Sequence, residues 1–187
     1  MLLTTLCYLE KDGRYLMMHR TKKEHDINKD KWIGVGGKFE DKESPEDCLL
    51  RETMEETGLR LTDYRFRGIV TFVTDRYETE FMHLFSAYAW EREGGSSAGE
   101  GPDGVIPCRE GVLEWLDMDK VYDLELWEGD RIFFRLMQDE APFFSLKLEY
   151  TGDELTAYAL DGEYHRQSYP HQNMYEEFLR SRRAKAK

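Results

Sequence analysis

Runs of apolar residues divide the chain into short strand candidates separated by polar turns. The predicted strands lie at residues 2–9, 14–19, 65–74, 79–90, 112–116, 143–150 and 154–160. The tripeptide Lys11-Asp12-Gly13 is typical of a hairpin turn between the first two strands. Thr151-Gly152-Asp153 predicts a second hairpin near the end of the chain.

Helical spacing appears at three places between or after these strands. Ser44 is a good N-cap, Pro45 suits the first helical position and Gly58 is a good stop, so a helix is predicted at 45–57. Apolar residues recur with helical spacing at 128–138. A last helix is expected to begin near Pro170 and to carry the basic tail RSRRAKAK.

The connecting segments predict loops but no boundary between domains. Residues 21–31 are polar and predict a mobile loop, and residues 92–107 are rich in Gly, Ser and Pro. The chain has 187 residues, which suits one domain with its own core. We therefore expect a single α/β domain over 1–187, with the hairpin and helix at about 143–183 as an extension.

Composition and charge narrow the class of protein. Hydrophobic residues make up 40% of the chain, which predicts a globular protein. The formal net charge of -12 argues against a surface for long nucleic acid, because such surfaces are basic. A small phosphorylated substrate held through a divalent cation remains compatible with this charge.

The cysteines and the N-terminus favour a cytoplasmic protein. Cys7, Cys48 and Cys108 have no metal-like spacing and are interpreted as thiols in a reducing compartment. The N-terminal residues predict a strand, not a signal peptide, and no apolar run approaches transmembrane length. No membrane partner is expected, and the oligomeric state is open between monomer and homodimer.

Three glutamates on the predicted helix at 45–57 are the first candidate for chemistry. Glu52, Glu55 and Glu56 stand at i, i+3 and i+4, which places them on one side within about one turn. Such a cluster is either a solvated helix face or a set of ligands for a hard divalent cation such as Mg²⁺. The glutamates alone do not decide between the two.

The residues around the glutamates carry a resemblance to a known family. From Gly37 onward the chain is similar to the Nudix hydrolase box, G-x5-E-x7-R-E-U-x-E-E-x-G-U, in which U is apolar. Every fixed position is matched, by Gly37, Glu43, Arg51, Glu52, Glu55, Glu56 and Gly58. Thr53 departs from the first apolar position, where slightly poorer packing is expected. The box covers residues 37–59.

The resemblance implies a fold, a reaction and a metal site. Nudix enzymes have a mixed β-sheet sandwiched between helices and hydrolyse nucleoside diphosphates linked to another group, using Mg²⁺ or Mn²⁺. It implies that the metal is held by Glu52, Glu55, Glu56 and the carbonyl group of Gly36, and that Arg51 orients the glutamates. Glu43 is expected to steady the junction between loop and helix.

A further carboxylate is expected from a loop before a late strand. Family members often supply one in a setting like E-G-x-L-E-W, and Glu110 begins such a stretch here. The resemblance therefore implies that Glu110 is a metal ligand or a base. The alternative is an ordinary charge on a polar loop.

Outlying positions resemble the MutT-like branch, which acts on oxidised-purine nucleoside triphosphates. The implied substrate-binding residues are Thr5, Arg20, Gly37, Lys38, Trp127 and Asp130. Ile33 and Gly129 depart from that branch, at positions where Asn and Asp read the base. Aromatic residues that could stack on a base are Trp127, Phe72, Phe81 and Phe134, although aromatics in such numbers are more often core.

The predicted function is hydrolysis of a nucleoside triphosphate, including 8-oxo-dGTP, to the monophosphate and pyrophosphate. The alternatives are another Nudix substrate, such as a nucleotide sugar, a dinucleotide or a capped RNA end, and a module that senses nucleotides without hydrolysis. The histidines show no metal spacing and are expected to be surface or core residues: His19, His25, His83, His165 and His171.

Overall fold

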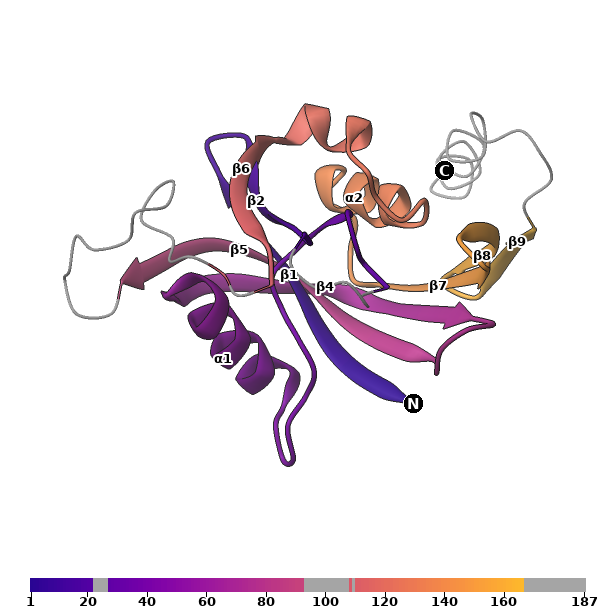
Figure 1. Ribbon diagram of the computed structural model, residues 1–187, viewed down its shortest axis with the longest axis horizontal. Coiled ribbons are helices and arrows are strands. Elements are labelled where there is room, and N and C mark those ends of the chain that lie inside the picture. The colour runs from indigo at the N-terminus through magenta and orange to yellow at the C-terminus, as the bar shows by residue number, and fades with distance from the viewer. Residues whose placement is uncertain (22–26, 93–107, 109, 167–187) are drawn as a thin grey trace.

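A mixed β-sheet crosses the molecule, and α-helices of the described residues lie on both of its faces (Figure 1). The computed structural model describes residues 1–21, 27–92, 108 and 110–166. In the view of Figure 1, α1 (Pro45–Thr57) lies below the sheet and α2 (Asp130–Gln138) above it. The fold is the predicted α/β sandwich of a sheet between helices.

The strands follow one another with short connections at most places. They are β1 (Leu2–Lys11), β2 (Arg14–His19), β3 (Trp32–Ile33), β4 (Leu59–Thr74), β5 (Glu80–Arg92), β6 (Val112–Asp117), β7 (Phe144–Thr151), β8 (Glu154–Leu160) and β9 (Glu163–Arg166). A short 3-10 helix, η3 (Met118–Asp123), follows β6.

The strand order in the sheet is β3-β2-β1-β5-β4-β7-β8-β9, and β6 also pairs with β2. β1 pairs with β5 in parallel, and so does β4 with β7, while the other pairs are antiparallel. β1 pairs with β2 only at its last residues, Leu9 to Lys11. The two strands therefore separate toward the start of β1, and this separation makes room for the site described below.

Two hydrophobic cores fill the spaces between the sheet and the helices. Successive side chains of a strand point to opposite faces, so Tyr8 and Tyr15 belong to the core under α2, while Cys7 and Leu16 belong to the core under α1. All four are fully or almost fully buried. Burial on both faces explains why β1 and β2 show nearly continuous apolar runs instead of alternation.

Helix α1 begins and ends where its sequence predicts. The Ser44 side chain accepts a hydrogen bond from the Asp47 N–H, and the Asp47 carboxylate accepts one from the Ser44 N–H, which completes a capping box. At the other end the Gly58 N–H donates to the Met54 carbonyl. The bounds of the helix agree with the prediction of 45–57.

Helix α2 is tied to the sheet by a buried arginine on β4. The Arg67 side chain is fully buried, and its Nη2 donates to the Met137 carbonyl at 3.1 Å. Its Nη1 lies 3.2 Å from the Tyr88 hydroxyl and 3.2 Å from a Glu140 carboxylate oxygen. The guanidinium group thus satisfies a carbonyl at the end of α2, which fixes the depth at which the helix lies on the sheet.

The sequence predicted most of these elements, with errors at their ends. The strands at 14–19 and 154–160 agree with β2 and β8, and 112–116 and 143–150 agree with β6 and β7 within one residue. The helix predicted at 128–138 begins two residues later, after its N-cap Gly129. The predicted loop at 92–107 and the helix from Pro170 lie outside the described residues, except for Arg92, which ends β5.

The prediction of 65–74 was too short, because β4 begins at Leu59. The register of β4 against β5 shifts between Leu61 and Asp63 and again between Phe66 and Gly68. Each β-bulge inserts a residue and breaks the two-residue alternation on which the prediction relied. The short elements β3, η3 and β9 were not predicted, because two to six residues carry too little pattern.

No helix in the described residues is both long and apolar enough to cross a membrane. The cytoplasmic location and the single domain over 1–187 stay predictions.

Candidate active site

The glycine-rich loop before α1 lies along β1 and continues the sheet into the site. The Thr5 N–H donates to the Gly37 carbonyl at 2.9 Å, and Cys7 and Val35 exchange both backbone hydrogen bonds. Gly36 has a φ of 144°, and a Cβ there would lie 2.2 Å from the Thr5 carbonyl oxygen. Only glycine lets the loop approach β1 so closely.

The same loop also touches the glutamates of α1. A Cβ on Gly37 would lie 2.3 Å from the carboxyl carbon of Glu52. Glycine at this position therefore allows the Glu52 carboxylate to lie directly against the loop backbone. The spacing of the motif has a steric reason in this structure, because the loop, β1 and α1 pack against one another at Gly36 and Gly37.

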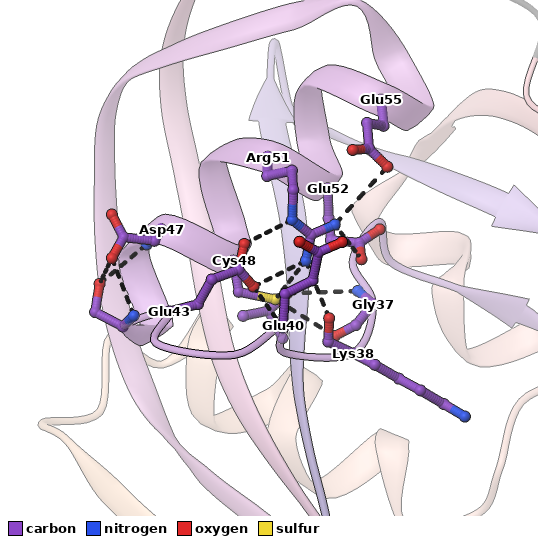
Figure 2. A network of polar contacts seen from close by, with 11 residues as sticks. Gly37, Lys38, Glu40, Glu43, Asp47, Cys48, Arg51, Glu52 and Glu55 are labelled. Atoms are coloured by element: carbon purple, nitrogen blue, oxygen red, sulfur yellow. Dashed lines mark hydrogen bonds and ion pairs between the residues drawn. The ribbon is translucent and has the colours of Figure 1, made fainter.

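Arg51 holds the carboxylates of the motif in place, as Figure 2 shows. Its Nε and Nη2 donate to the two oxygens of Glu43 at 2.6 and 2.9 Å. Its Nη1 donates to Glu52 at 2.8 Å, and Nη2 also reaches the Lys38 carbonyl at 3.0 Å. These bonds lower the pKa of Glu43 to about 2, chiefly through the Arg51 hydrogen bond. The network matches the expected orienting role of Arg51 and the expected junction role of Glu43.

Glu56 is the most buried carboxylate of the motif, with 8% of its surface exposed. Its Oε2 accepts a hydrogen bond from the Gly36 N–H at 2.8 Å. Burial raises the pKa of Glu56 to about 8, the Gly36 hydrogen bond opposes this, and the nearby charges of Glu52 and Glu110 raise it further. Two like charges beside a buried carboxyl group are the electrostatic setting that a cation relieves.

Glu55 does not point the same way as its neighbours. Its side chain is 61% exposed, and its contact is with Arg51, at 3.8 Å. Successive residues of a helix are turned by about 100°, so Glu52 and Glu56 share a face more closely than Glu55 and Glu56 do. The three glutamates therefore do not lie together on one side, and the ligand role of Glu55 stays a prediction.

Glu110 reaches the site from the segment before β6. Its carboxylate forms an ion pair with Arg20, at the end of β2, and both side chains are largely buried. The two residues lie 90 positions apart in the sequence and line the same cleft as Glu52 and Glu56. Neither residue is an ordinary surface charge.

The set of oxygen donors fits a hard divalent cation. Glu52, Glu56 and Glu110 line one cleft, with the backbone of Gly36 beside them. Within the described residues, no three side chains already surround a common point at which an ion would be held. A metal here would need water or substrate oxygens to complete its shell, as Mg²⁺ commonly does.

The cleft continues from the carboxylates to an apolar region and has a volume of about 1030 Å³. Thr5, Gly37 and Lys38 lie on its lining, as expected, and the Lys38 side chain extends away from the Arg51 network (Figure 2). The apolar region is lined by Leu6, Ile33, Phe72, Met82 and Trp127.

Trp127 and Asp130 lie in the apolar region, just before and at the start of α2. The Trp127 indole donates to Asn28 at 2.8 Å, and the Lys31 ammonium lies 4.6 Å from the centroid of the Trp127 ring. The Asp130 carboxyl group is 5% exposed, and burial raises its pKa to about 8 despite the charges of Lys31 and Arg131. A carboxyl group in such a place can read a hydrogen-bonding edge of a ligand.

Of the four aromatic residues suggested for stacking on a base, two do not line the cleft, so the suggested role was wrong for these two. Phe72 lines the cleft and its ring lies 5.3 Å from that of Trp127. Phe134 is fully buried against Tyr8 and Tyr15 in the core instead. Phe81 is absent from the cleft lining, because alternation along β5 directs it to the face of α1.

The same alternation brings residues into the cleft that the motif comparison missed. Glu80 and Met82 of β5 line it, and so do Thr4 of β1 and Asn28. The signal was present in the sequence, because residues two apart on a strand share a face. To use this signal, one must know which face of β5 borders the cleft.

None of the three histidines that the structure describes lines the cleft, whereas two cysteines contact residues that do: Cys48 Sγ lies 3.5 Å from the Thr5 hydroxyl, and the Glu110 N–H donates to Cys108 Sγ at 3.5 Å. His19 stacks on Trp32 at 4.5 Å and His165 on Tyr158 at 4.7 Å, while His83 contacts the Thr4 carbonyl at 3.0 Å. His25 and His171 lie outside the described residues. The three cysteines are buried thiols, and burial raises the pKa of Cys48 and Cys108.

Solved structures with a similar architecture include MutT and Nudix proteins. A MutT protein from Bacillus halodurans superposes with a TM-score of 0.71 at 25% identity, over 87% of this chain and 99% of that one. The chain belongs to the Nudix hydrolase family, whose NUDIX domain model matches residues 3–137.

Curated relatives span nearly the same length. An oxidized purine nucleoside triphosphate hydrolase from Danio rerio is 30% identical over 161 residues, which are 85% of this chain and 94% of that protein. The uncharacterized Nudix hydrolase YvcI from Bacillus subtilis is 27% identical over 164 residues, 86% of this chain and 94% of that protein. The box identified in the sequence is thus part of a family-wide similarity.

Proposed function

We propose that this Nudix hydrolase cleaves nucleoside triphosphates to the monophosphate and pyrophosphate with the help of Mg²⁺ or Mn²⁺. The observation that carries this proposal is one cleft whose lining includes Glu52, Glu56 and Glu110 together with Phe72, Trp127 and Asp130. A triphosphate needs a cation-binding end, and its base needs an apolar wall with polar groups. The relative from Danio rerio supports the same class of substrate.

The chain's own residues supply binding, orientation and proton transfer. Glu52, Glu56 and Glu110 would hold the metal, which neutralises the charge that develops on the phosphoryl oxygens. Arg51 keeps Glu52 oriented through the 2.8 Å hydrogen bond. Lys38 and Arg20, both on the cleft lining, would attract the phosphate groups.

Accepting the proton of the attacking water is a task for one of the carboxylates. Glu52 is the better candidate in this structure, because Arg51 orients its carboxylate, whereas burial favours the protonated form of Glu56. Glu56, bound to the Gly36 N–H, would then serve as a ligand alone.

The test is an assay of the purified protein with Mg²⁺ and a panel of normal and oxidised nucleoside triphosphates, a nucleotide sugar, a dinucleotide and a capped RNA end. We expect turnover of triphosphates, with monophosphate and pyrophosphate as products. Absence of turnover for every triphosphate would refute the proposal, and product analysis would identify any other Nudix substrate.

Glu56→Gln is the matching variant, since it removes a metal ligand and keeps the size of the side chain. We expect hydrolysis to fall by about two orders of magnitude or more, with an unchanged circular dichroism spectrum. Glu154→Gln, an exposed change on β8 with the same loss of charge, should retain full activity. A module that only senses nucleotides would bind them in both variants and hydrolyse them in neither.

A further inference from the structure

A second carboxyl group, besides Asp130, lies in the base-binding part of the cleft. Glu80 begins β5 and points to the face of the sheet that α2 covers, together with Met82. Neither the family box nor the outlying positions that resemble the MutT-like branch include Glu80. Its side chain is partly buried, and burial raises the pKa of its carboxyl group, while the Thr4 hydrogen bond and the Lys38 charge oppose this.

The position of Glu80 follows from the sheet register. It lies opposite Phe72 on β4 and opposite Leu2 on β1. Directly paired residues have Cβ atoms about 4.5–5.5 Å apart, so Glu80 lies at the edge of the Phe72 ring. The Phe72 ring contacts Trp127 at 5.3 Å, and the Asp130 N–H donates to the Trp127 carbonyl. Two carboxyl groups, those of Glu80 and Asp130, thus line the same cleft as the adjacent rings of Phe72 and Trp127.

Glu80 has acceptor capacity left over for a ligand. The Thr4 hydroxyl donates to its Oε1 at 2.7 Å. Among the contacts of the described residues, no hydrogen bond reaches Oε2. An ionised carboxyl group only accepts hydrogen bonds, and each oxygen accepts up to two. A partly buried carboxylate with an unused oxygen is costly unless a bound molecule supplies a donor.

Because an ionised carboxyl group only accepts hydrogen bonds, Glu80 would recognise a hydrogen-bond donor on the ligand. Adenine carries a 6-amino group and guanine a 2-amino group, and both are hydrogen-bond donors, whereas hypoxanthine has a carbonyl oxygen at position 6 and only a hydrogen atom at position 2. A site with a carboxylate at that edge binds the donor and leaves the carboxylate unpaired when the donor is missing. Ile33, which also lines the apolar region, cannot compensate with a hydrogen bond.

We infer that Glu80 is a specificity-determining residue of the proposed nucleotide site, and that its carboxylate accepts a hydrogen bond from an exocyclic amino group of a purine base lying on Phe72 and Trp127. The inference rests on the proposed function for the identity of the substrate. It adds a residue that selects among purines and does not act on the phosphates.

The experiment compares three purine nucleotides that differ at the amino group: dGTP with a 2-amino group, dATP with a 6-amino group, and dITP with neither. For the wild-type protein we expect kcat/KM for the better amino purine to exceed that for dITP about ten-fold. Glu80→Leu should lower kcat/KM for the amino purines more than for dITP and so bring the ratio to within about two-fold. Glu80→Gln, which keeps a carbonyl oxygen, should lie between them.

Binding of the products dGMP, dAMP and dIMP, measured by calorimetry, tests the inference without hydrolysis. The same order of affinities and the same loss of preference in Glu80→Leu are expected. Glu154→Gln controls for the change of charge, and its preference should equal that of the wild type.

The two proposals fail in different ways. Absence of hydrolysis with a Glu80-dependent preference in binding would overturn the proposed function and keep the inference. Hydrolysis with a ratio that Glu80→Leu does not change, or with dITP as good as both amino purines, would overturn the inference alone. An equal loss for all three nucleotides in Glu80→Leu would show a purely structural role and would also overturn it.

Discussion

At the scale of single residues, one guanidinium group orients two carboxylates of the motif. Arg51 bonds to both oxygens of Glu43 and to Glu52, and a planar fork is needed to reach all of them. The structure therefore explains why an arginine stands between a loop glutamate and the helix glutamates.

Arg51→Lys should weaken both stability and turnover. Lysine keeps the charge but cannot bind two carboxylates in the same geometry, so we expect a loss of about 1–2 kcal/mol in the free energy of unfolding and at least about a ten-fold fall in kcat. Urea denaturation and steady-state kinetics measure the two effects. Arg60→Lys, in an exposed pair with Glu91, should change neither by much.

The ionisation of Asp130 makes the stability of the protein depend on pH. Its pKa is raised to about 8 from an ordinary value of 3.8, so between about pH 4 and pH 8 the folded protein holds a proton that the unfolded chain has released. The contribution of this carboxyl group to stability is therefore full below about pH 4 and is lost as the pH rises through about 8.

Asp130→Asn removes this pH dependence, so the free energy of unfolding of the variant should exceed that of the wild type at high pH. We expect the variant and the wild type to differ least in free energy of unfolding at pH 4, and the variant to gain relative to the wild type at pH 9. Urea denaturation at both pH values measures the change. Parallel pH profiles for the two proteins would contradict the assignment of the raised pKa to Asp130.

At the scale of elements, α2 brings Asp130 to the cleft and Arg67 holds the far end of α2. Arg67→Leu leaves the Met137 carbonyl without its buried donor, and we expect a loss of about 1–3 kcal/mol in the free energy of unfolding. Since the helix also carries Asp130, KM for nucleotides should rise more than kcat falls.

Arg65→Leu is the matched control for this prediction. Arg65 pairs with the same Glu140 oxygen at 2.9 Å, but its side chain is 46% exposed, so its loss should cost less than about 1 kcal/mol. Equal costs for the two variants would show that burial of Arg67 does not anchor the helix.

The elements also show where pattern reading succeeds. Helix α1 was predicted to the residue, because a cap, a proline and a terminal glycine are local signals. β4 was predicted six residues too short, because its bulges interrupt the alternation. The stacking roles of Phe81 and Phe134 were wrong, since a strand or helix pattern does not say which face borders a cavity.

At the scale of the whole molecule, the site joins segments that are distant in the sequence. β1, the glycine loop, α1, the segment before β6 and the start of α2 all line one cleft. Like-charged carboxylates are gathered there in a chain whose net charge is already -12, which destabilises the metal-free protein.

Binding of Mg²⁺ should therefore stabilise the folded protein without nucleotide. A cation at 100 times its dissociation constant adds about 2.7 kcal/mol, which should raise Tm by several degrees for a chain of this size. Differential scanning calorimetry with Mg²⁺ or with EDTA measures the shift. Glu56→Gln should reduce the shift and Glu154→Gln should keep it, and equal shifts in all three proteins would place the cation elsewhere.

The sequence by itself determined the family and the position of α1. These depend on spacing along a single loop and helix, so 23 contiguous positions, 37–59, contain the information. The pairing of Arg51 with Glu43 and Glu52 is likewise local, because all three belong to the same box.

The tertiary structure decided which glutamates of α1 face the cleft and which other residues line it. Glu52 and Glu56 face the cleft while Glu55 is exposed, because the direction of each side chain depends on how α1 lies against β1 and the glycine loop. Glu80 and Asp130 line the same cleft only through the register of β5 against β4 and the packing of α2. These two residues lie 50 positions apart in the sequence, so their presence in one cleft depends on packing in three dimensions, which no local pattern encodes.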